Sequence, residues 1–89
     1  MKAVITVVGR DKVGILARVS GECAEKGVNI IDVTQSVMQD MFCMIMLADI
    51  DGITVPFADF TRHMASMGES MNMKIHCMHE EIFNSMHRI

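Results

Sequence analysis

Tryptophan and tyrosine are absent from this 89-residue sequence, and all aromatic residues together make up 4% of it. RNA recognition on a sheet surface needs exposed aromatic rings, and Phe42 is the only candidate on the first or third expected strand. The eight lysines and arginines are scattered and the formal net charge is −3, so the electrostatic footprint of a nucleic-acid-binding protein is missing. We therefore expect no nucleic-acid partner.

Long apolar runs are also absent. No run approaches the roughly 18 residues of a transmembrane helix, and residues 2–8 have a strand pattern where a secretory signal would have a charged start. Cys23, Cys43 and Cys77 are odd in number, far apart and embedded in apolar segments, which favours buried reduced thiols over disulfides. We expect no membrane partner and a cytoplasmic location.

The motifs of common enzyme classes are missing too. The sequence has no Ser-His-Asp arrangement, no pair of carboxylates flanking a plausible cleft and no glycine-rich phosphate loop. Gly9 and Gly14 do not have the spacing of a dinucleotide-binding fingerprint. These absences predict a protein that is not an enzyme and that carries no cofactor.

The segment His76-Cys77-Met78-His79 contains the side chains of a soft-metal site. In an extended strand, however, His76 and Met78 face one way while Cys77 and His79 face the other, so the four cannot bind one ion. We therefore expect no metal site, with metal sensing through His76 or Cys77 as a minor alternative.

The pattern of apolar residues predicts four strands and three helices. The strands are expected at residues 2–8, 28–39, 42–48 and 72–78, with Asp40-Met41 as a hairpin connection, and the helices at about 14–26, from Thr54 and Pro56 onward, and at about 79–89. The first and third strands are apolar on both faces, so they are central, whereas the other two alternate like edge strands. This order predicts an α+β fold: a ferredoxin-like βαββαβ sandwich with an antiparallel sheet of order 4-1-3-2 and a short C-terminal helix, in a single domain over residues 1–89.

Each predicted helix has one apolar side. The first places Leu16, Val19, Ser20 and Cys23 on that side and ends at Gly27; the second has Phe57, Phe60, Met64, Met67 and Met71; the third has Ile82, Phe83, Met86 and Ile89. Thr54 can cap the second helix with its hydroxyl. The third helix needs a surface to cover, either the open face of its own sheet or a second subunit.

The turn Gly9-Arg10-Asp11-Lys12-Val13-Gly14 joins the first strand to the first helix and is the candidate binding site. Its glycines permit positive φ and close approach, and Asp11 can accept hydrogen bonds from the helix start. Further N–H donors there point outward at the positive end of the helix dipole, which suits a carboxylate. On these residues alone, an ordinary tight turn with a cap is the competing interpretation.

The run from Gly9 to Ala17, together with Ala24-Glu25-Lys26-Gly27-Val28-Asn29-Ile30, resembles the ACT domain, a small-molecule-sensing module of amino-acid metabolism. The resemblance spans essentially the whole chain and is closest to stand-alone single-ACT-domain proteins related to the glycine-cleavage-system repressor. It implies an amino acid bound where the first strand-to-helix loop of one subunit meets the start of the second strand of its neighbour. The positions that match the ligand-binding positions of the family are Asp11, Lys12, Val13, Gly14, Asn29 and Ile30.

In such a site, helix-start N–H groups would hold the carboxylate of the amino acid, while Asp11 and the Asn29 carbonyl would accept hydrogen bonds from its ammonium. Asp11 could instead merely cap the helix, and Asn29 could be a turn residue that follows Gly27. Two positions depart from the family: Gly9 stands where some serine-binding members carry a polar residue, and Val13 replaces a common proline.

The resulting hypothesis is a non-catalytic regulatory module. It forms a homodimer or higher homo-oligomer, binds a small amino acid at a subunit interface, and signals its occupancy to a partner enzyme or regulator. The alternative is a protein-interaction module without a small ligand, which docks its partner through a methionine-rich face or the terminal helix.

Overall fold

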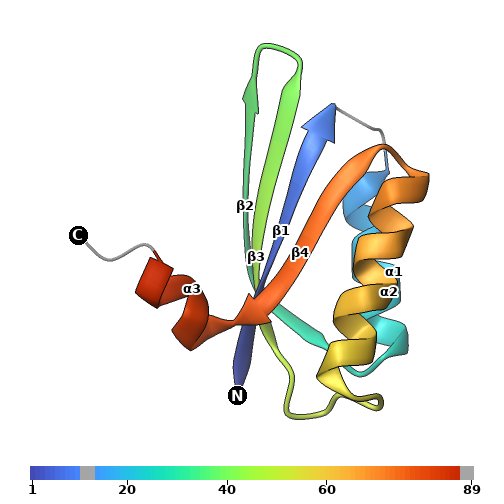
Figure 1. Ribbon diagram of the computed structural model, residues 1–89, viewed down its shortest axis with the longest axis vertical. Coiled ribbons are helices and arrows are strands. Elements are labelled where there is room, and N and C mark those ends of the chain that lie inside the picture. Colours follow the sequence, from blue (N-terminus) through green and yellow to red (C-terminus); the bar gives the residue numbers. More distant parts are fainter. Residues whose placement is uncertain (11–13, 87–89) are drawn as a thin grey trace.

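The computed structural model describes residues 1–10 and 14–86, and within them four strands and three helices alternate as β-α-β-β-α-β-α (Figure 1). They are β1 (Lys2–Arg10), α1 (Ile15–Glu25), β2 (Asn29–Met38), β3 (Met41–Asp49), α2 (Phe57–Ser70), β4 (Met73–His79) and α3 (Glu80–Met86). The strands form one antiparallel sheet in the order β2-β3-β1-β4. This is the ferredoxin-like topology that the sequence predicted, with the additional C-terminal helix.

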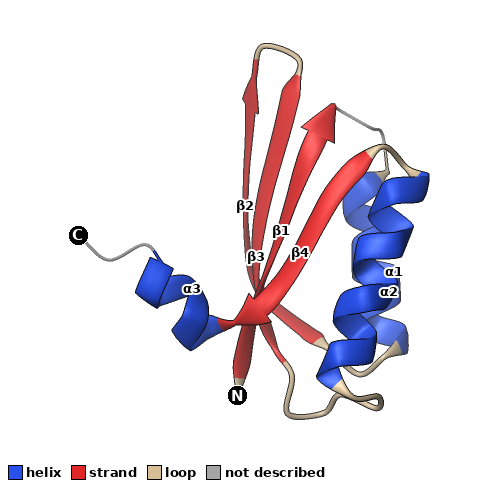
Figure 2. Ribbon diagram, in the orientation of Figure 1, coloured by secondary structure: helices blue, strands red, loops and turns tan. Residues whose placement is uncertain are grey.

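The sheet has a covered face and an open face (Figure 2). α1 and α2 lie together on the covered face, where a contact of 2.8 Å between His63 Nε2 and Glu22 Oε2 joins them. α2 packs mainly on β4, and α1 lies nearer to β2. α3 leaves the end of β4 on the other side of the sheet, so the open face has only this short helix beside it.

The two central strands are β1 and β3, as their apolar sequences predicted. They pair along their whole length, from Lys2 opposite Asp49 to Arg10 opposite Met41. β2 and β4 are the edge strands, and the alternation along β4 is the predicted one, since Met73, Ile75 and Cys77 are buried while the residues between them are exposed.

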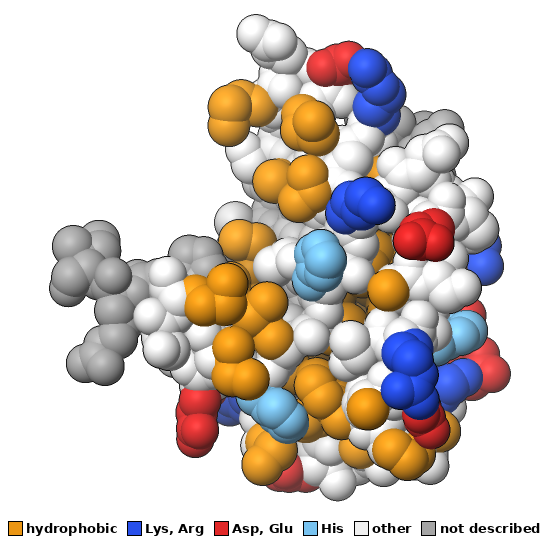
Figure 3. All heavy atoms as spheres, in the orientation of Figure 1, with side chains coloured by type: hydrophobic (Ala, Val, Ile, Leu, Met, Phe, Trp, Pro, Cys, Tyr) orange, Lys and Arg blue, Asp and Glu red, His pale blue; other side chains and the backbone are white. Residues whose placement is uncertain are grey.

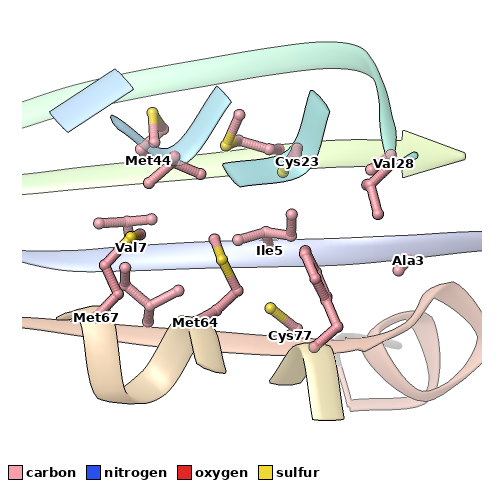
Figure 4. Close-up of a cluster of buried hydrophobic side chains, with 14 of the residues drawn as sticks. Ala3, Ile5, Val7, Cys23, Val28, Met44, Met64, Met67 and Cys77 are labelled. Carbon is pink, nitrogen blue, oxygen red and sulfur yellow. The ribbon is translucent and has the colours of Figure 1, made fainter. Parts of the chain in front are cut away.

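The core lies between the sheet and the two long helices (Figure 4). α2 buries the predicted stripe with Phe60, Met64 and Met67. In α1 the prediction was wrong at one position: Leu16 is 37% exposed, and Ile15 takes its place in the core. The reason is spacing, because Ile15 lies four and eight residues before Val19 and Cys23 and so shares their stripe, which Leu16 does not.

The β2–β3 hairpin turns at Gln39 and Asp40, one residue earlier than predicted. Gln39 adopts a φ of 58°, the conformation for which two-residue hairpin turns usually use glycine or asparagine. β2 also departs from regular alternation, since its register with β3 shifts between Ile30 and Asp32. This bulge leaves Ile31 46% exposed.

Thr54 does not cap α2. Its N–H and its hydroxyl both donate to the Lys26 carbonyl, at 2.9 and 3.2 Å, so they connect the β3–α2 loop to the end of α1. Pro56 is the residue that precedes the first turn of α2, and it provides no side-chain hydrogen bond.

α3 begins at Glu80, one residue later than predicted, because His79 still pairs with Ala3 in the sheet. The last three residues of the predicted helix, among them Ile89, lie outside the described residues. Within residues 1–10 and 14–86, no helix is long and apolar enough to cross a membrane.

Candidate functional site

The structure describes only part of the junction between β1 and α1. β1 continues to Arg10, beyond its predicted end at residue 8, and the predicted site residues Asp11, Lys12 and Val13 lie outside the described residues. Gly14 is the N-cap of α1 with φ 86° and ψ 4°, and its carbonyl accepts a hydrogen bond of 3.0 Å from the Arg18 N–H. This left-handed conformation explains why glycine occupies the position.

The first turn of α1 presents backbone donors. No group among residues 1–10 and 14–86 accepts a hydrogen bond from the N–H of Ile15, Leu16 or Ala17, and this turn contains no acidic side chain. Among residues 1–10 and 14–86, nothing lies within 4 Å of a Cβ atom added to Gly14. Together with the positive end of the helix dipole, these donors can bind a carboxylate.

The junction lies at the hairpin end of the sheet, where Arg10 forms an ion pair with Asp40. Gly9 belongs to β1 and pairs with Phe42 and Met73, and a Cβ there would stand 3.0 Å from the Asn72 carbonyl oxygen and 3.2 Å from the Met73 Cα. Packing of β4 against β1 therefore accounts for the glycine at this departure from the family pattern.

The start of β2 is fixed by two close glycines. Gly27 ends α1 with a φ of 77°, as predicted, and a Cβ there would stand 2.2 Å from the Gly52 carbonyl oxygen. Asn29 follows with an exposed side chain that can reach a ligand, whereas Ile30 is half-buried and packs against the core.

These two parts of the predicted site do not meet within one chain. Gly14 precedes α1, and Asn29 and Ile30 follow it, so the 11-residue helix separates them by about 16 Å. A small amino acid spans far less than this distance. Gly14 and Asn29 can therefore contribute to one site for a small ligand only if they come from two different chains.

The three cysteines have different environments. Burial, with a smaller contribution from Glu22, raises the pKa of Cys23 to about 11. Burial, with a smaller contribution from Cys23, raises the pKa of Cys77 to about 12. Both are core thiols, as predicted, but Cys43 is exposed on the open face because its neighbours Phe42 and Met44 face the core.

The His76–His79 segment does not bring its side chains together. His76 is exposed on the open face, Cys77 is buried on the covered face, and the ring of His79 lies 4.5 Å from that of Phe57. In the part of the chain that the structure describes, no three His, Cys, Asp or Glu side chains are grouped to hold a metal ion.

A hollow between the open face and α3 was not predicted as a site. It has a volume of about 450 Å³ and lies over β1, β3 and β4. The sequence did contain a signal for it, because strands such as β1 and β3 that are apolar on both faces need cover on both faces.

The sequence matches the ACT domain family over residues 2–77. This chain belongs to the ACT domain family. It is 47% identical over 89 residues to a UPF0237 protein of Listeria monocytogenes, with 100% of both chains covered. The ACT domain protein from Streptococcus pneumoniae is similar in structure, with a TM-score of 0.81 and 41% identity over 93% of each chain.

A putative glycine cleavage system transcriptional repressor has the same fold, with a TM-score of 0.70 and 24% identity over 85% of this chain and 43% of the other. ACT domains are regulatory modules, and the family match covers residues 2–77 of the present chain. The glycine at position 14 and the Gly27-to-Ile30 segment thus lie at the two ends of α1 in an ACT domain.

Proposed function

We propose that this ACT domain is a non-catalytic regulatory module of the cytoplasm that binds a small amino acid between two copies of the chain. The observation that carries the proposal is the separation of Gly14 from Asn29 by the length of α1, together with the open edge of β2. Neither half is a complete site. Each half has what the other lacks: N–H donors at Gly14, and an exposed amide side chain at Asn29.

Pairing of β2 with β2 of a second copy would join the two halves. In an antiparallel pair the start of one β2 lies beside the end of the other, and the end of β2 is the hairpin end of the sheet, where the β1–α1 junction lies. α1 lies on the covered face and is nearer than α2 to β2. A two-fold axis would thus place Asn29 of each chain near Gly14 of the other, at two equivalent sites.

The edge of β2 is suited to such pairing. Asp32 is the only charged residue on it, it contains no proline, and its backbone has a partner strand on one side only. Edge strands that must stay unpaired usually carry lysine or proline. In the assembled site the first-turn amides would bind the carboxylate, and Asp11 and the Asn29 carbonyl would bind the ammonium.

A ligand that bridges two chains favours one arrangement of the subunits, and a partner enzyme or regulator can respond to that arrangement. The coupling requires no chemistry at the site. It requires only that the two chains fit the ligand better in one geometry than in another.

A thermal-shift screen of the full chain against the common amino acids tests the proposal. An amino acid present at about 100 times its Kd should stabilise the protein by about 2.7 kcal/mol, which raises Tm by about 10–20 °C. Asp11→Ala should abolish that rise, whereas the control Glu69→Ala, an exposed carboxylate on α2, should keep it. Stabilisation that is equal in both variants, or absent with every amino acid, would contradict the proposed site.

A further inference from the structure

The open face of the sheet is apolar along its centre. Val4, Thr6 and Val8 of β1 lie there beside Cys43, Ile45 and Leu47 of β3, with which they pair. Ile45, in the middle of the face, is 44% exposed. Apolar side chains gather between the hairpin end of the sheet and α3, and the charged ones lie mainly around them (Figure 3). A solvated sheet face would instead alternate polar residues into these positions.

α3 stands beside this face without covering it. Ile82 and Met86 are 52% and 65% exposed, and the helix contacts its own sheet mainly at β1 and β4. The hollow of about 450 Å³ between α3 and the sheet is lined by Val8, Ile45, His76, Met78, Phe83 and Met86. The chain therefore has two uncovered apolar surfaces, a sheet face and a helix side, which meet at a concave corner.

We propose that a second copy of the chain packs its open face on this open face, with α3 of each copy flanking the sheet of the other. This interface differs from the β2 edge, because it uses the face of the sheet and needs no strand pairing.

The sheet face is somewhat smaller than one side of a stable dimer interface, and α3 extends it. Four strands about 4.8 Å apart, each about nine residues long at about 3.3 Å per residue, cover about 19 by 30 Å. That is nearly 600 Å² before the relief of the side chains is counted, and the apolar side of α3 adds to it. Stable interfaces bury about 800 Å² per partner.

Charged side chains of the open face lie at its two edges. Lys74 and His76 lie on the β4 side of the open face, and Asp32 lies on the β2 side. When two such faces pack about a two-fold axis parallel to the strands, the β4 side of one copy lies over the β2 side of the other. In the register of the sheet Asp32 is level with Met78, and Lys74 is level with Ser36, so each of these charges then faces an uncharged residue of the other copy and like charges do not meet across the interface.

Sedimentation velocity on Ile45→Lys tests the interface. The variant buries no lysine within its own chain, since Ile45 is on the open face, so it should fold with unchanged circular dichroism. A symmetric interface contains the substituted residue twice, once from each copy. Because loss of one central anchor weakens binding about thirtyfold, loss of both should weaken association about a thousandfold. The mass of the wild-type particle should halve in the variant at micromolar concentration. Ser66→Lys, an exposed position on α2, is the matched control and should keep the wild-type mass.

Thiol labelling gives a second measurement. Cys43 on the open face should react slowly with Ellman's reagent in the wild-type assembly and rapidly in Ile45→Lys, where the face is uncovered. Wild-type mass in Ile45→Lys, or rapid labelling of Cys43 in the assembled wild type, would overturn the proposal.

The β2 edge is tested separately with Ile31→Lys, which places like charges along that edge. A particle that Ile31→Lys dissociates but Ile45→Lys leaves intact would overturn the face interface and support the edge. A particle that Ile45→Lys dissociates but Ile31→Lys leaves intact would support the face interface and contradict the β2 pairing of the proposed ligand site.

Discussion

Replacement of Gly27 by alanine is expected to destabilise this ACT domain much more than the same replacement at Gly14. Both glycines are left-handed, with φ of 77° and 86°, so each alanine carries a conformational cost of about 1–2 kcal/mol. Their surroundings differ. A Cβ at Gly14 meets nothing within 4 Å in the described part of the chain, whereas at Gly27 it would stand 2.2 Å from the oxygen and 3.2 Å from the carbon of the Gly52 carbonyl.

The contact at Gly27 is with backbone, which cannot rotate away as the end of a long side chain can. The β3–α2 loop must therefore move, and overpacking of this kind costs about 1–3 kcal/mol in addition. The expected loss is about 2–5 kcal/mol for Gly27→Ala and about 1–2 kcal/mol for Gly14→Ala. In a domain of this size the extra cost corresponds to a difference in Tm of about 4–24 °C between the variants.

Urea denaturation followed by circular dichroism measures both losses, provided that the m-values agree. Gly21→Ala is the control, since a Cβ at this α1 position meets nothing within 4 Å and its φ is not positive. It should stabilise the protein by about 0.5–1 kcal/mol. Equal losses of unfolding free energy in Gly14→Ala and Gly27→Ala would refute the reasoning, because the close approach of Gly27 to Gly52 would then add nothing to the cost of the substitution.

Two further predictions concern the core. Stability should fall between about pH 9 and pH 12, because the raised pKa values of Cys23 and Cys77 mean that the folded state keeps its neutral thiols in full below pH 9 and loses this advantage as the pH rises through about 11 and 12. Each thiol contributes a slope of about 1.4 kcal/mol per pH unit in urea titrations, so Cys77→Ala should flatten the profile, and an unchanged slope would contradict the assignment. Met64→Ala should cost about 2–5 kcal/mol by the same method, whereas Met86→Ala on α3 should change stability by less than about 0.5 kcal/mol if α3 is not buried against its own sheet.

The topology could be predicted from the sequence because central and edge strands differ in how apolar and polar residues alternate along them. β1 and β3 are apolar at consecutive positions, and only a strand with cover on both faces uses such a sequence. Local irregularities could not be predicted in the same way. The turn at Gln39 uses a positive φ without glycine, and the bulge at Ile31 inserts one residue into β2, so neither has a signal in residue type.

The candidate site could be predicted only in its parts. Gly14 and Gly27 have the left-handed conformations expected for glycines at helix ends, because residue type and local geometry are directly linked there. The distance between Gly14 and Asn29 depends on where α1 begins and ends, and the proposal of a site between two chains rests on that distance. The roles of Asp11, Lys12 and Val13 stay predictions, since these residues lie outside the described part of the chain.

The core owes much of its volume to methionine, with Met44, Met46, Met64, Met67 and Met73 buried. Thioether sulfur can be oxidised to the sulfoxide. Each sulfoxide would place a polar oxygen among apolar side chains that offer it no hydrogen-bond donor. The integrity of this protein therefore depends on the oxidative state of its surroundings. Peroxide exposure that unfolds even a small fraction of molecules would expose further sulfurs, so damage would spread from one side chain to the next.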